Sequence, residues 1–452
     1  MAKGARAGLP PTSQVEPVDA GASRVPAFRG RPGRRATFGE AGHRGNGEDH
    51  EPADSLPLGA GNGAIAGKVG RPQLMRAINE RLLLEHIRAV GPVSRAELAR
   101  ASGLSKPTVA LALANLEQDG LLELAGLRTG SRGPAAVLYE VRPDAGYVLG
   151  LDVGREYLRG ALADVGGTVL ARLSRPAHAA SAKVRVAELI ALADELASAA
   201  GVTRSRVTQV VIGSPGVYDR ARGALTMAAN VPGWENPKIL VDLERSLGPT
   251  TIVENDIDLA ALAERDMGHG RKVASFCFVS VGTGIGMGLV IDGRLHRGAH
   301  GAAGEIAYLP IGDVEVTSTE ARRHGLLEAA ASASAVVKAA KSQGMRPSAS
   351  AREVFAAAAR GAKAATAVVE REAWLIARAV SSVVAVVDPE LVVLGGGIGQ
   401  APGFAEAVAA QLAHLVPFLP DVRVSALGHE AVVDGSLVLG LERAWQRILD
   451  RS

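Results

Sequence analysis

The chain of 452 residues contains a single cysteine, Cys277, and only 3% aromatic side chains. One thiol excludes an internal disulfide framework and any zinc site built from several cysteines of one chain. No apolar run approaches the roughly 20 residues that span a bilayer, and the N-terminus lacks a basic stretch followed by an apolar segment. These absences predict a cytoplasmic protein with no membrane contact, whose cores are filled by aliphatic side chains.

The chain also lacks a large excess of either charge, because 50 basic and 47 acidic residues give a formal net charge of only +3. The positive excess lies entirely before residue 144, and proteins that bind nucleic acid concentrate positive charge on the contacting module. Residues 1–70 are rich in Gly, Pro, Ala, Arg and Ser without apolar periodicity, so burial cannot offset the entropy of ordering them. We predict a disordered tail at 1–70, either genuine or the product of an upstream start codon.

Residues 71–143 carry the signals of three helices. Ser94 is a good N-cap for a short helix that ends at Gly103, and Ser105 caps a third helix with Pro107 in its first turn. Helix, short helix, tight turn and helix is the pattern of a helix-turn-helix. An ordinary three-helix bundle is the alternative interpretation.

Two short strands, expected at 121–124 and 136–141, enclose a loop rich in arginine and glycine at 128–134. Such a loop is typical of a wing that lies on a phosphate backbone or in a minor groove. Residues 104–109 and 132–134 resemble the winged helix-turn-helix of the ROK (repressor, open reading frame, kinase) family. The resemblance implies that double-stranded operator DNA is contacted by Ser105, Lys106, Pro107, Thr108, Asn115, Arg128 and Arg132.

Residues 146–452 read as buried strands, glycine turns and helices, beginning with three strands joined by hairpins within 146–170 and including a helix expected over 324–342. This order resembles the ROK branch of the actin-like sugar-kinase fold, an α/β fold in which two lobes close over a cleft. The resemblance implies a first lobe of about 146–265 plus the C-terminal helix, and a second lobe of about 266–435.

The nucleotide side of the expected cleft departs from the family pattern. Backbone amides approach phosphate only through glycine-rich turns, and the family reads Asp-x-Gly-Gly-Thr in the first of these. This chain has Arg155 and Glu156 at the last two positions, which place a side chain and a like charge where phosphate should lie. We therefore expect no cofactor, and vestigial nucleotide loops at Asp152, Gly154, Gly282, Thr283, Gly284, Gly395 and Gly396.

The sugar side is better preserved. Glu254-Asn255-Asp256 resembles the family motif whose aspartate takes a proton from a sugar hydroxyl, so Asp256 is expected to be a vestigial base. A simple cap at a helix start is the alternative for Asn255 and Asp256. The resemblance implies that a sugar-like ligand is bound by Asn230, Asn255, Asp256, Glu305 and Tyr308, of which Tyr308 replaces a family histidine.

A metal site is not expected. The family's three zinc cysteines align with Thr319, Ala321 and Leu326, and structural zinc needs about four nitrogen or sulfur ligands. Scattered histidines such as His324 are more typical of a surface.

Together these features predict a DNA-binding transcriptional regulator of ROK type that senses a sugar or sugar-like ligand. We expect it to be a repressor and not an enzyme. Two alternatives stay open: an ATP-dependent sugar kinase that carries a DNA-binding domain, and an inactive body that only dimerises that domain. A homodimer or tetramer is expected, because helix-turn-helix proteins gain affinity from paired half-sites. The effector, the operator and the oligomer interface are not readable from the sequence.

Overall fold

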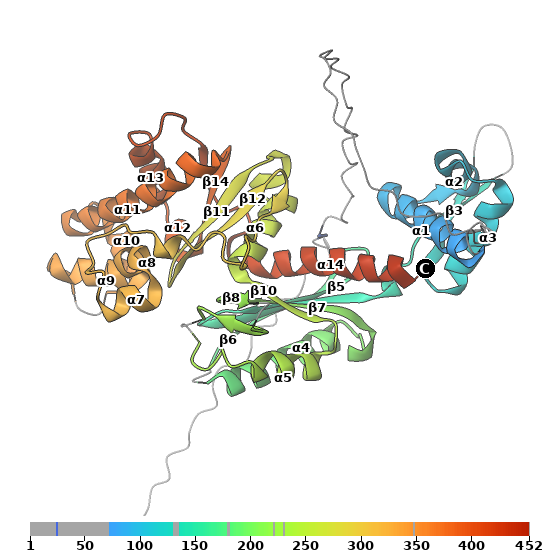
Figure 1. Ribbon diagram of the computed structural model, residues 1–452, viewed down its shortest axis with the longest axis horizontal. Helices are drawn as coiled ribbons and strands as arrows, with labels where there is room; N and C mark the ends of the chain where they lie inside the picture. The colour runs from blue at the N-terminus through green and yellow to red at the C-terminus, as the bar shows by residue number, and fades with distance from the viewer. Residues whose placement is uncertain are drawn as a thin grey trace, which may run out of the picture. The chain divides into compact units, whose positions relative to one another are not determined.

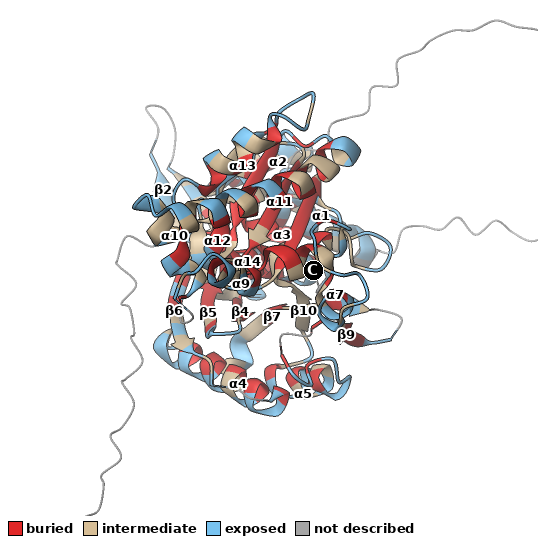
Figure 2. Ribbon diagram, turned by 90° about the vertical axis from the view of Figure 1, so that its left-hand side faces the viewer, coloured by how far each residue is buried: buried red, intermediate tan, exposed pale blue. Residues whose placement is uncertain are grey.

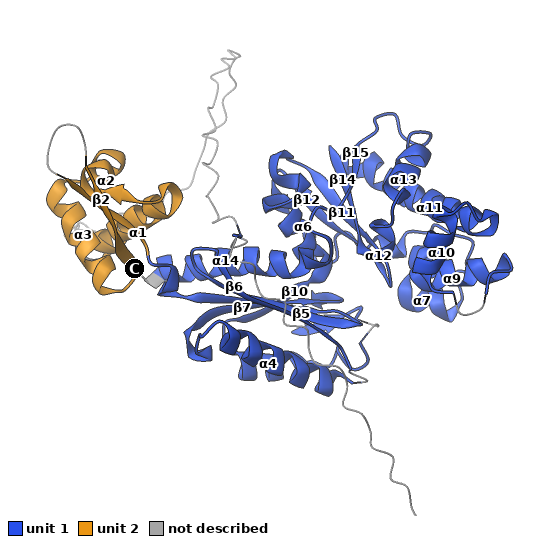
Figure 3. Cartoon of the chain, turned by 180° about the vertical axis from the view of Figure 1, so that it is seen from behind, with its two compact units in different colours: residues 1–28, 142–451 blue, residues 29–141, 452 orange. Residues whose placement is uncertain are grey.

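The computed structural model describes residues 24–25, 72–129, 135–178, 181–219, 222–228, 231–346 and 349–451. The chain divides between Val141 and Arg142 into two compact units, which Figure 3 colours separately. Among the described residues, no helix has both the length and the apolar character needed to cross a bilayer.

The tail predicted at 1–70 lies outside the described residues except for Arg24 and Val25. Arg24 forms an isolated β-bridge with Thr168, and the Val25 N–H donates to the Gly167 carbonyl at 3.0 Å. Val25 is 1% exposed. These two residues of the tail therefore pack on the body.

The smaller unit is a winged helix-turn-helix (Figure 1). Its three strands pair antiparallel in the order β1-β3-β2. The first strand of the wing runs to Arg128, four residues beyond the predicted end. The elements are α1 (Pro72–Val90), β1 (Val93–Ser94), α2 (Arg95–Ser102), α3 (Lys106–Gln118), β2 (Leu122–Arg128) and β3 (Ala136–Val141).

Local sequence signals explain where these helices start and stop. Ser94 and Glu97 form a reciprocal capping box at α2, and Gly103 ends it in the left-handed region at φ 71°. The Ser105 side chain accepts the N–H of Thr108 at the start of α3. On α3, the predicted buried face is confirmed, since Val109, Leu113 and Leu116 are each 0% exposed.

The larger unit contains two five-stranded sheets of identical strand order. The first is β6-β5-β4-β7-β10 and the second is β13-β12-β11-β14-β15. In each, the first three strands in the chain pair antiparallel and the last two add in parallel. The strands are β4 (Tyr147–Val153), β5 (Tyr157–Asp164), β6 (Val169–Pro176), β7 (Val207–Ser214), β10 (Thr251–Asn255), β11 (Phe276–Val281), β12 (Ile285–Ile291), β13 (Arg294–Leu295), β14 (Leu391–Gly395) and β15 (Asp421–Val424).

Helices cover both faces of each sheet, with the buried residues concentrated between the layers (Figures 1 and 2). α4 (Ala182–Ala199) and α5 (Lys238–Leu247) pack their leucines on one face of the first sheet. α11 (Lys363–Val387) and α13 (Phe404–Leu412) do the same for the second sheet.

The helix that follows the last strand of each sheet packs across to the other sheet. α6 (Asp256–Asp266), which follows the first sheet, places Ala260 and Ala261 against Phe278 and Val393 of the second. α14 (Ala431–Arg451), which follows the second sheet, lies on the first sheet on the face opposite α4 (Figure 1). α6 therefore packs against both lobes, although the sequence places it at the end of the first.

The single helix expected over 324–342 is interrupted at two points, and the helix before the first interruption starts earlier than predicted. Gly325 adopts φ 86°, and its backbone lies so close to the Ala307 carbonyl that a Cβ would sit 2.2 Å from that oxygen. Ser332 is extended between the last two helices. The three helices are α7 (Thr319–His324), α8 (Leu326–Ala331) and α9 (Ala333–Ser342).

Candidate functional site

The first turn of α3 is the exposed part of the helix-turn-helix. Ser105, Lys106 and Pro107 are exposed. The Ser105 hydroxyl lies 2.8 Å from the Thr108 hydroxyl, so these two groups cap the helix and orient each other. The arrangement leaves the Lys106 ammonium and the end of the helix facing solvent.

Two other residues expected to contact DNA are held within the unit. The Asn115 amide donates to the Glu80 carboxylate of α1 at 2.5 Å, and Glu80 is only 6% exposed. Asn115 thus joins α1 to α3, which removes it from our set of base-reading residues. Arg128 pairs with Glu97 at 2.6 Å while half its side chain stays exposed, and Arg132 lies outside the described residues.

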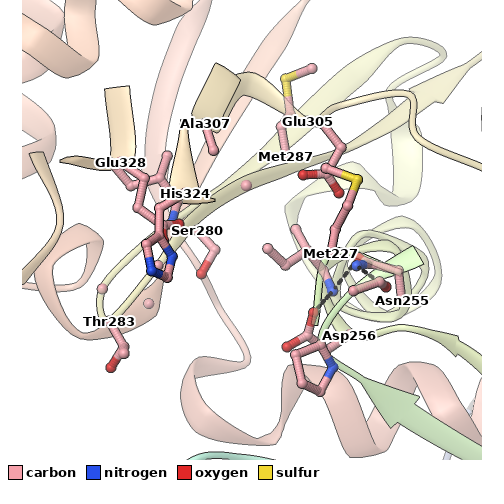
Figure 4. Close-up of a pocket in the computed structure, with 18 of the residues that line it drawn as sticks. Met227, Asn255, Asp256, Ser280, Thr283, Met287, Glu305, Ala307, His324 and Glu328 are labelled. Carbon is pink, nitrogen blue, oxygen red and sulfur yellow. Dashed lines mark hydrogen bonds and ion pairs between the residues drawn. The ribbon is translucent and has the colours of Figure 1, made fainter. Parts of the chain in front are cut away.

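The body contains a cavity of about 290 Å³ between the two sheets, close to the lower end of the roughly 300–1,000 Å³ typical of small-ligand pockets. Figure 4 shows Asn255 and Asp256 on one side, and Glu305 with Ala307 on another. Asn255 and Asp256 end β10 and begin α6, while Glu305 follows the loop after β13. The fold thus assembles the cavity from both lobes.

Asn255 is a helix cap with every polar atom engaged. Its side-chain oxygen accepts the N–H groups of Ile257 and Asp258 at 2.9 and 3.0 Å, and its nitrogen donates to the Gly216 carbonyl at 3.0 Å. The capping alternative weighed for this residue is what the structure shows. Asn230, the other amide expected to bind a ligand, lies outside the described residues.

Asp256 presents a carboxyl group to the cavity. One of its oxygens accepts the Ile257 N–H at 2.9 Å. Burial in the cleft raises the pKa of Asp256 to about 7, and the nearby charges of Asp152 and Glu305 add to this effect. A carboxyl group so placed can accept or donate a hydrogen bond to a ligand hydroxyl near neutral pH.

Glu305 and Tyr308 are fixed by backbone packing. Gly304, at φ 93°, passes so close to the Met287 carbonyl that a Cβ would lie 1.9 Å from its oxygen, and the Met287 N–H donates to the Gly304 carbonyl at 3.0 Å. Burial raises the pKa of Glu305, and the charge of Glu328 raises it further. Tyr308 lines the cavity and is 45% exposed.

The segment aligned with the family's zinc site is held without metal chemistry. His324 Nδ1 lies 3.0 Å from Glu328, and the other Glu328 oxygen accepts the Ile285 N–H at 2.8 Å. Thr319, Ala321 and Leu326 supply no nitrogen or sulfur ligand, so the residues do not fit zinc. Within the described ranges, no group of three or more His, Cys, Asp or Glu side chains is arranged to hold a metal.

The first nucleotide loop is occupied by the protein's own side chains. Arg159 donates to the buried Asp152 carboxylate at 3.2 Å. Arg185, whose side chain is 4% exposed, donates to the carbonyls of Gly154 and Arg155 at 3.1 and 3.4 Å. Arg155, which lines the cavity, places a side chain where the family motif has glycine, so the loop fits a nucleotide phosphate poorly.

The other two glycine loops lie against each other. A Cβ on Gly282 would sit 3.3 Å from the Gly397 nitrogen, and one on Gly396, at φ 76°, would sit 2.4 Å from the Val281 carbonyl. A Cβ on Gly286 would sit 2.5 Å from Ile257 of α6. Close packing within the second lobe, and of that lobe against α6, is thus sufficient to require these glycines.

Sequence reasoning missed an ion pair behind the cavity. Arg297, in the loop after β13, donates to Glu254 of β10 at 2.9 and 2.7 Å. It joins the two segments that carry Asp256 and Glu305. Because the partners are 43 residues apart, no local pattern could have revealed it.

A winged helix-turn-helix followed by a two-lobed body with a cleft combines a DNA-binding fold with a sugar-kinase-like fold. The chain belongs to the ROK family, whose pattern matches residues 148–443. A winged helix-turn-helix DNA-binding pattern matches residues 76–123.

Known proteins similar to this chain include regulators and kinases. The xylose repressor of Caldicellulosiruptor bescii is 28% identical over 244 residues, 54% of this chain and 61% of that protein. The matched region thus spans about three fifths of that relative. An N-acetylmannosamine kinase of Shigella boydii is 30% identical over 292 residues, 64% of this chain and 97% of that protein.

A solved ROK family transcriptional regulator, described as a homologue of the E. coli MLC protein, shares the fold. Its TM-score is 0.67 at 24% identity, over 83% of this chain and 98% of that one.

Proposed function

We propose that this protein is a DNA-binding transcriptional repressor whose cleft binds a sugar or sugar-like effector without phosphorylating it. The observation that supports this most is the contrast within the cleft. Asp256 and Glu305 present carboxyl groups to the cavity. At the first nucleotide loop, which lines the same cavity, Arg155 stands where the family motif has glycine and Arg159 pairs with the motif's Asp152.

For DNA we propose contacts from the exposed start of α3 and from the wing, made by Ser105, Lys106, Pro107, Thr108, Arg128 and Arg132. Arg128 would leave or share Glu97 on contact with phosphate, because a surface ion pair contributes little stability. A homodimer or tetramer in the cytoplasm would place two recognition helices on paired half-sites.

For the effector we propose hydrogen bonds from Asp256 and Glu305, with Tyr308 at the rim, Asn230 as an additional donor and Asn255 holding the segment in place. A ligand changes DNA affinity only if it binds the DNA-bound and free forms differently. Similarity to a xylose repressor and to an N-acetylmannosamine kinase makes xylose, glucose and N-acetylmannosamine reasonable probes.

The test starts with genome-wide mapping of DNA binding, followed by fluorescence anisotropy with a fragment that contains a mapped site. Replacement Lys106→Ala should weaken binding and lower the salt slope by about 1, as expected for one lost phosphate contact. Lys363→Ala, an exposed lysine of the body, is the matched control. Absence of specific sites, or equal salt slopes for both variants, would contradict the DNA assignment.

The sugar assignment is tested by calorimetry with the three probes and by repeating anisotropy in their presence. Binding with a change in DNA affinity supports it. No heat from any probe, with unchanged DNA affinity, would overturn it for this class of sugar.

A sugar kinase is the second candidate, favoured by the pKa of about 7 at Asp256, which suits a general base. We expect no ADP release above background in a coupled assay. Turnover that Asp256→Ala abolishes would replace the repressor proposal with this one.

A further inference from the structure

Met227 has a backbone conformation that its side chain does not explain. Three described residues other than glycine have positive φ: Met227 at 60°, Asp292 at 50° and Asp388 at 50°. Asp292 lies in the tight turn between β12 and β13, and Asp388 caps the end of α11. Asp tolerates this region through local hydrogen bonds, whereas methionine gains no such bond there.

The chain on both sides of Met227 is held in place. Met227 follows β9 (Ala224–Thr226), whose Thr226 pairs with Val217 of β8 (Val217–Asp219). Gly216 packs so closely that a Cβ there would lie 2.5 Å from the Thr226 carbonyl and 2.9 Å from the Ala228 side chain. Surroundings this tight impose the unusual backbone on Met227.

Two further hydrogen bonds hold this segment, and the second connects it to the cleft. The Ala228 N–H donates to the Glu235 carboxylate at 3.0 Å. Gly216, which packs on the segment, accepts from the Asn255 side chain at 3.0 Å. The position of Met227 is therefore coupled to the residue that precedes Asp256.

The side chain of Met227 is 39% exposed and lines the cavity. In the view of Figure 4 it extends from the side of Asn255 and Asp256 toward Glu305. Met287 also lines the cavity, so the space holds two thioethers together with the carboxyl groups. Methionine is flexible and polarisable, and it adapts to apolar ligand surfaces.

We propose that Met227 is a specificity-determining residue of the cleft, which covers the C–H face of a bound monosaccharide while carboxyl groups bind its hydroxyls. The ligand class is a neutral sugar with no charged or bulky polar group on the face toward Met227. This inference rests on the proposed binding of a sugar.

The experiment compares D-xylose, D-glucose and N-acetyl-D-mannosamine by calorimetry on the full chain. Met227→Leu keeps an apolar side chain and should preserve the order of affinities within about threefold. Met227→Asn tolerates the same backbone but presents an amide, and it should change the ratio between the best and the next sugar by about tenfold or more. Thermal melting of each variant verifies that it is folded.

The possible outcomes separate the two proposals. If the wild type binds a probe and Met227→Asn leaves every ratio unchanged, Met227 does not determine specificity and sugar sensing stands. If Met227→Leu alters the ratios as strongly as Met227→Asn does, the apolar contact is not the cause and the inference is also overturned. If the wild type binds none of the three probes, both proposals fail for this ligand class.

Discussion

Asp152 lies near the end of β4 and Asp256 directly follows β10 of the same sheet, yet their surroundings differ. Asp152 is 5% exposed. Burial raises its pKa to about 6, and the charge of its partner Arg159 limits this rise. Asp256 lines the cavity, where burial and neighbouring acids raise its pKa to about 7. One carboxyl group is engaged by the fold, and the other is available to a ligand.

The same difference separates the two sides of the cleft. Asp152 and Gly154 match a nucleotide-binding motif, but Arg159 pairs with the Asp152 carboxylate and Arg185 binds the Gly154 carbonyl. On the other side, Asn255 also matches its motif and is fully engaged as a cap. A matching residue type therefore shows ancestry, and its hydrogen-bond partners show whether it is free to bind.

The largest effect on sugar binding is expected from a change of Asp256. Asp256→Asn should weaken the tightest sugar about 100-fold, because a hydrogen bond to a charged group contributes roughly 1.5–3 kcal/mol. Calorimetry measures this loss directly.

Asp152→Asn is the matched control, since the same change is made on the other side of the cleft. Asp152 does not line the cavity and acts on it only by raising the pKa of Asp256. We therefore expect the sugar affinity of this variant to change by less than about tenfold, which is clearly less than for Asp256→Asn. Equal losses in both variants would show that the two sides do not differ as described.

Asp258 is a third buried carboxyl group of this region, and it should make the stability of the protein depend on pH. Burial raises its pKa to about 8, the charge of Glu254 adds to the shift, and Arg297 opposes it. A raised folded-state pKa means that the folded chain binds more protons than the unfolded chain. The contribution of Asp258 to the free energy of unfolding is therefore complete below about pH 4 and is lost as the pH rises through 8.

Wild-type stability should therefore fall between pH 5 and 8, and Asp258→Asn should reduce that fall by on the order of 2 kcal/mol. Urea unfolding at the two pH values provides the measurement. Asp242→Asn, at a partly exposed ion pair on α5, should leave the fall unchanged. A fall as steep in Asp258→Asn as in the wild type would contradict the assignment.

The sequence predicts the elements whose signals are local. The caps Ser94 and Ser105, the α3 core and the three strands expected within 146–170 follow from spacing and turn residues. It fails where distant segments decide, as at 324–342, where the close approach of Gly325 to the Ala307 carbonyl interrupts the expected helix.

The candidate site shows the same limit. Asp256 and Glu305 could be named from motifs, and the cavity brings both together. The backbone of Met227 depends on Gly216, and the engagement of Asn115 depends on Glu80, 35 residues away. Neither contact leaves a periodic or local signature in the chain.

A smaller effect is expected from the ion pair behind the cavity. Arg297→Gln leaves Glu254, 19% exposed, without its partner and should lower the free energy of unfolding by about 1 kcal/mol. The double variant with Glu254→Gln should recover part of this loss, because no unpaired charge remains. A double variant as unstable as the sum of the two single variants would show that the residues do not interact.

The smallest effect is expected from restoring the family's loop sequence. Arg155→Gly with Glu156→Thr recreates the kinase motif, yet Arg159 still neutralises Asp152 and Arg185 still binds the loop carbonyls. We expect no ADP release above background with any probe sugar, since the Asp152 carboxylate of the motif stays paired with Arg159. ADP release that Asp256→Ala abolishes would show that two side chains alone separate this cleft from an active one, and that the internal arginine contacts are not what prevents catalysis.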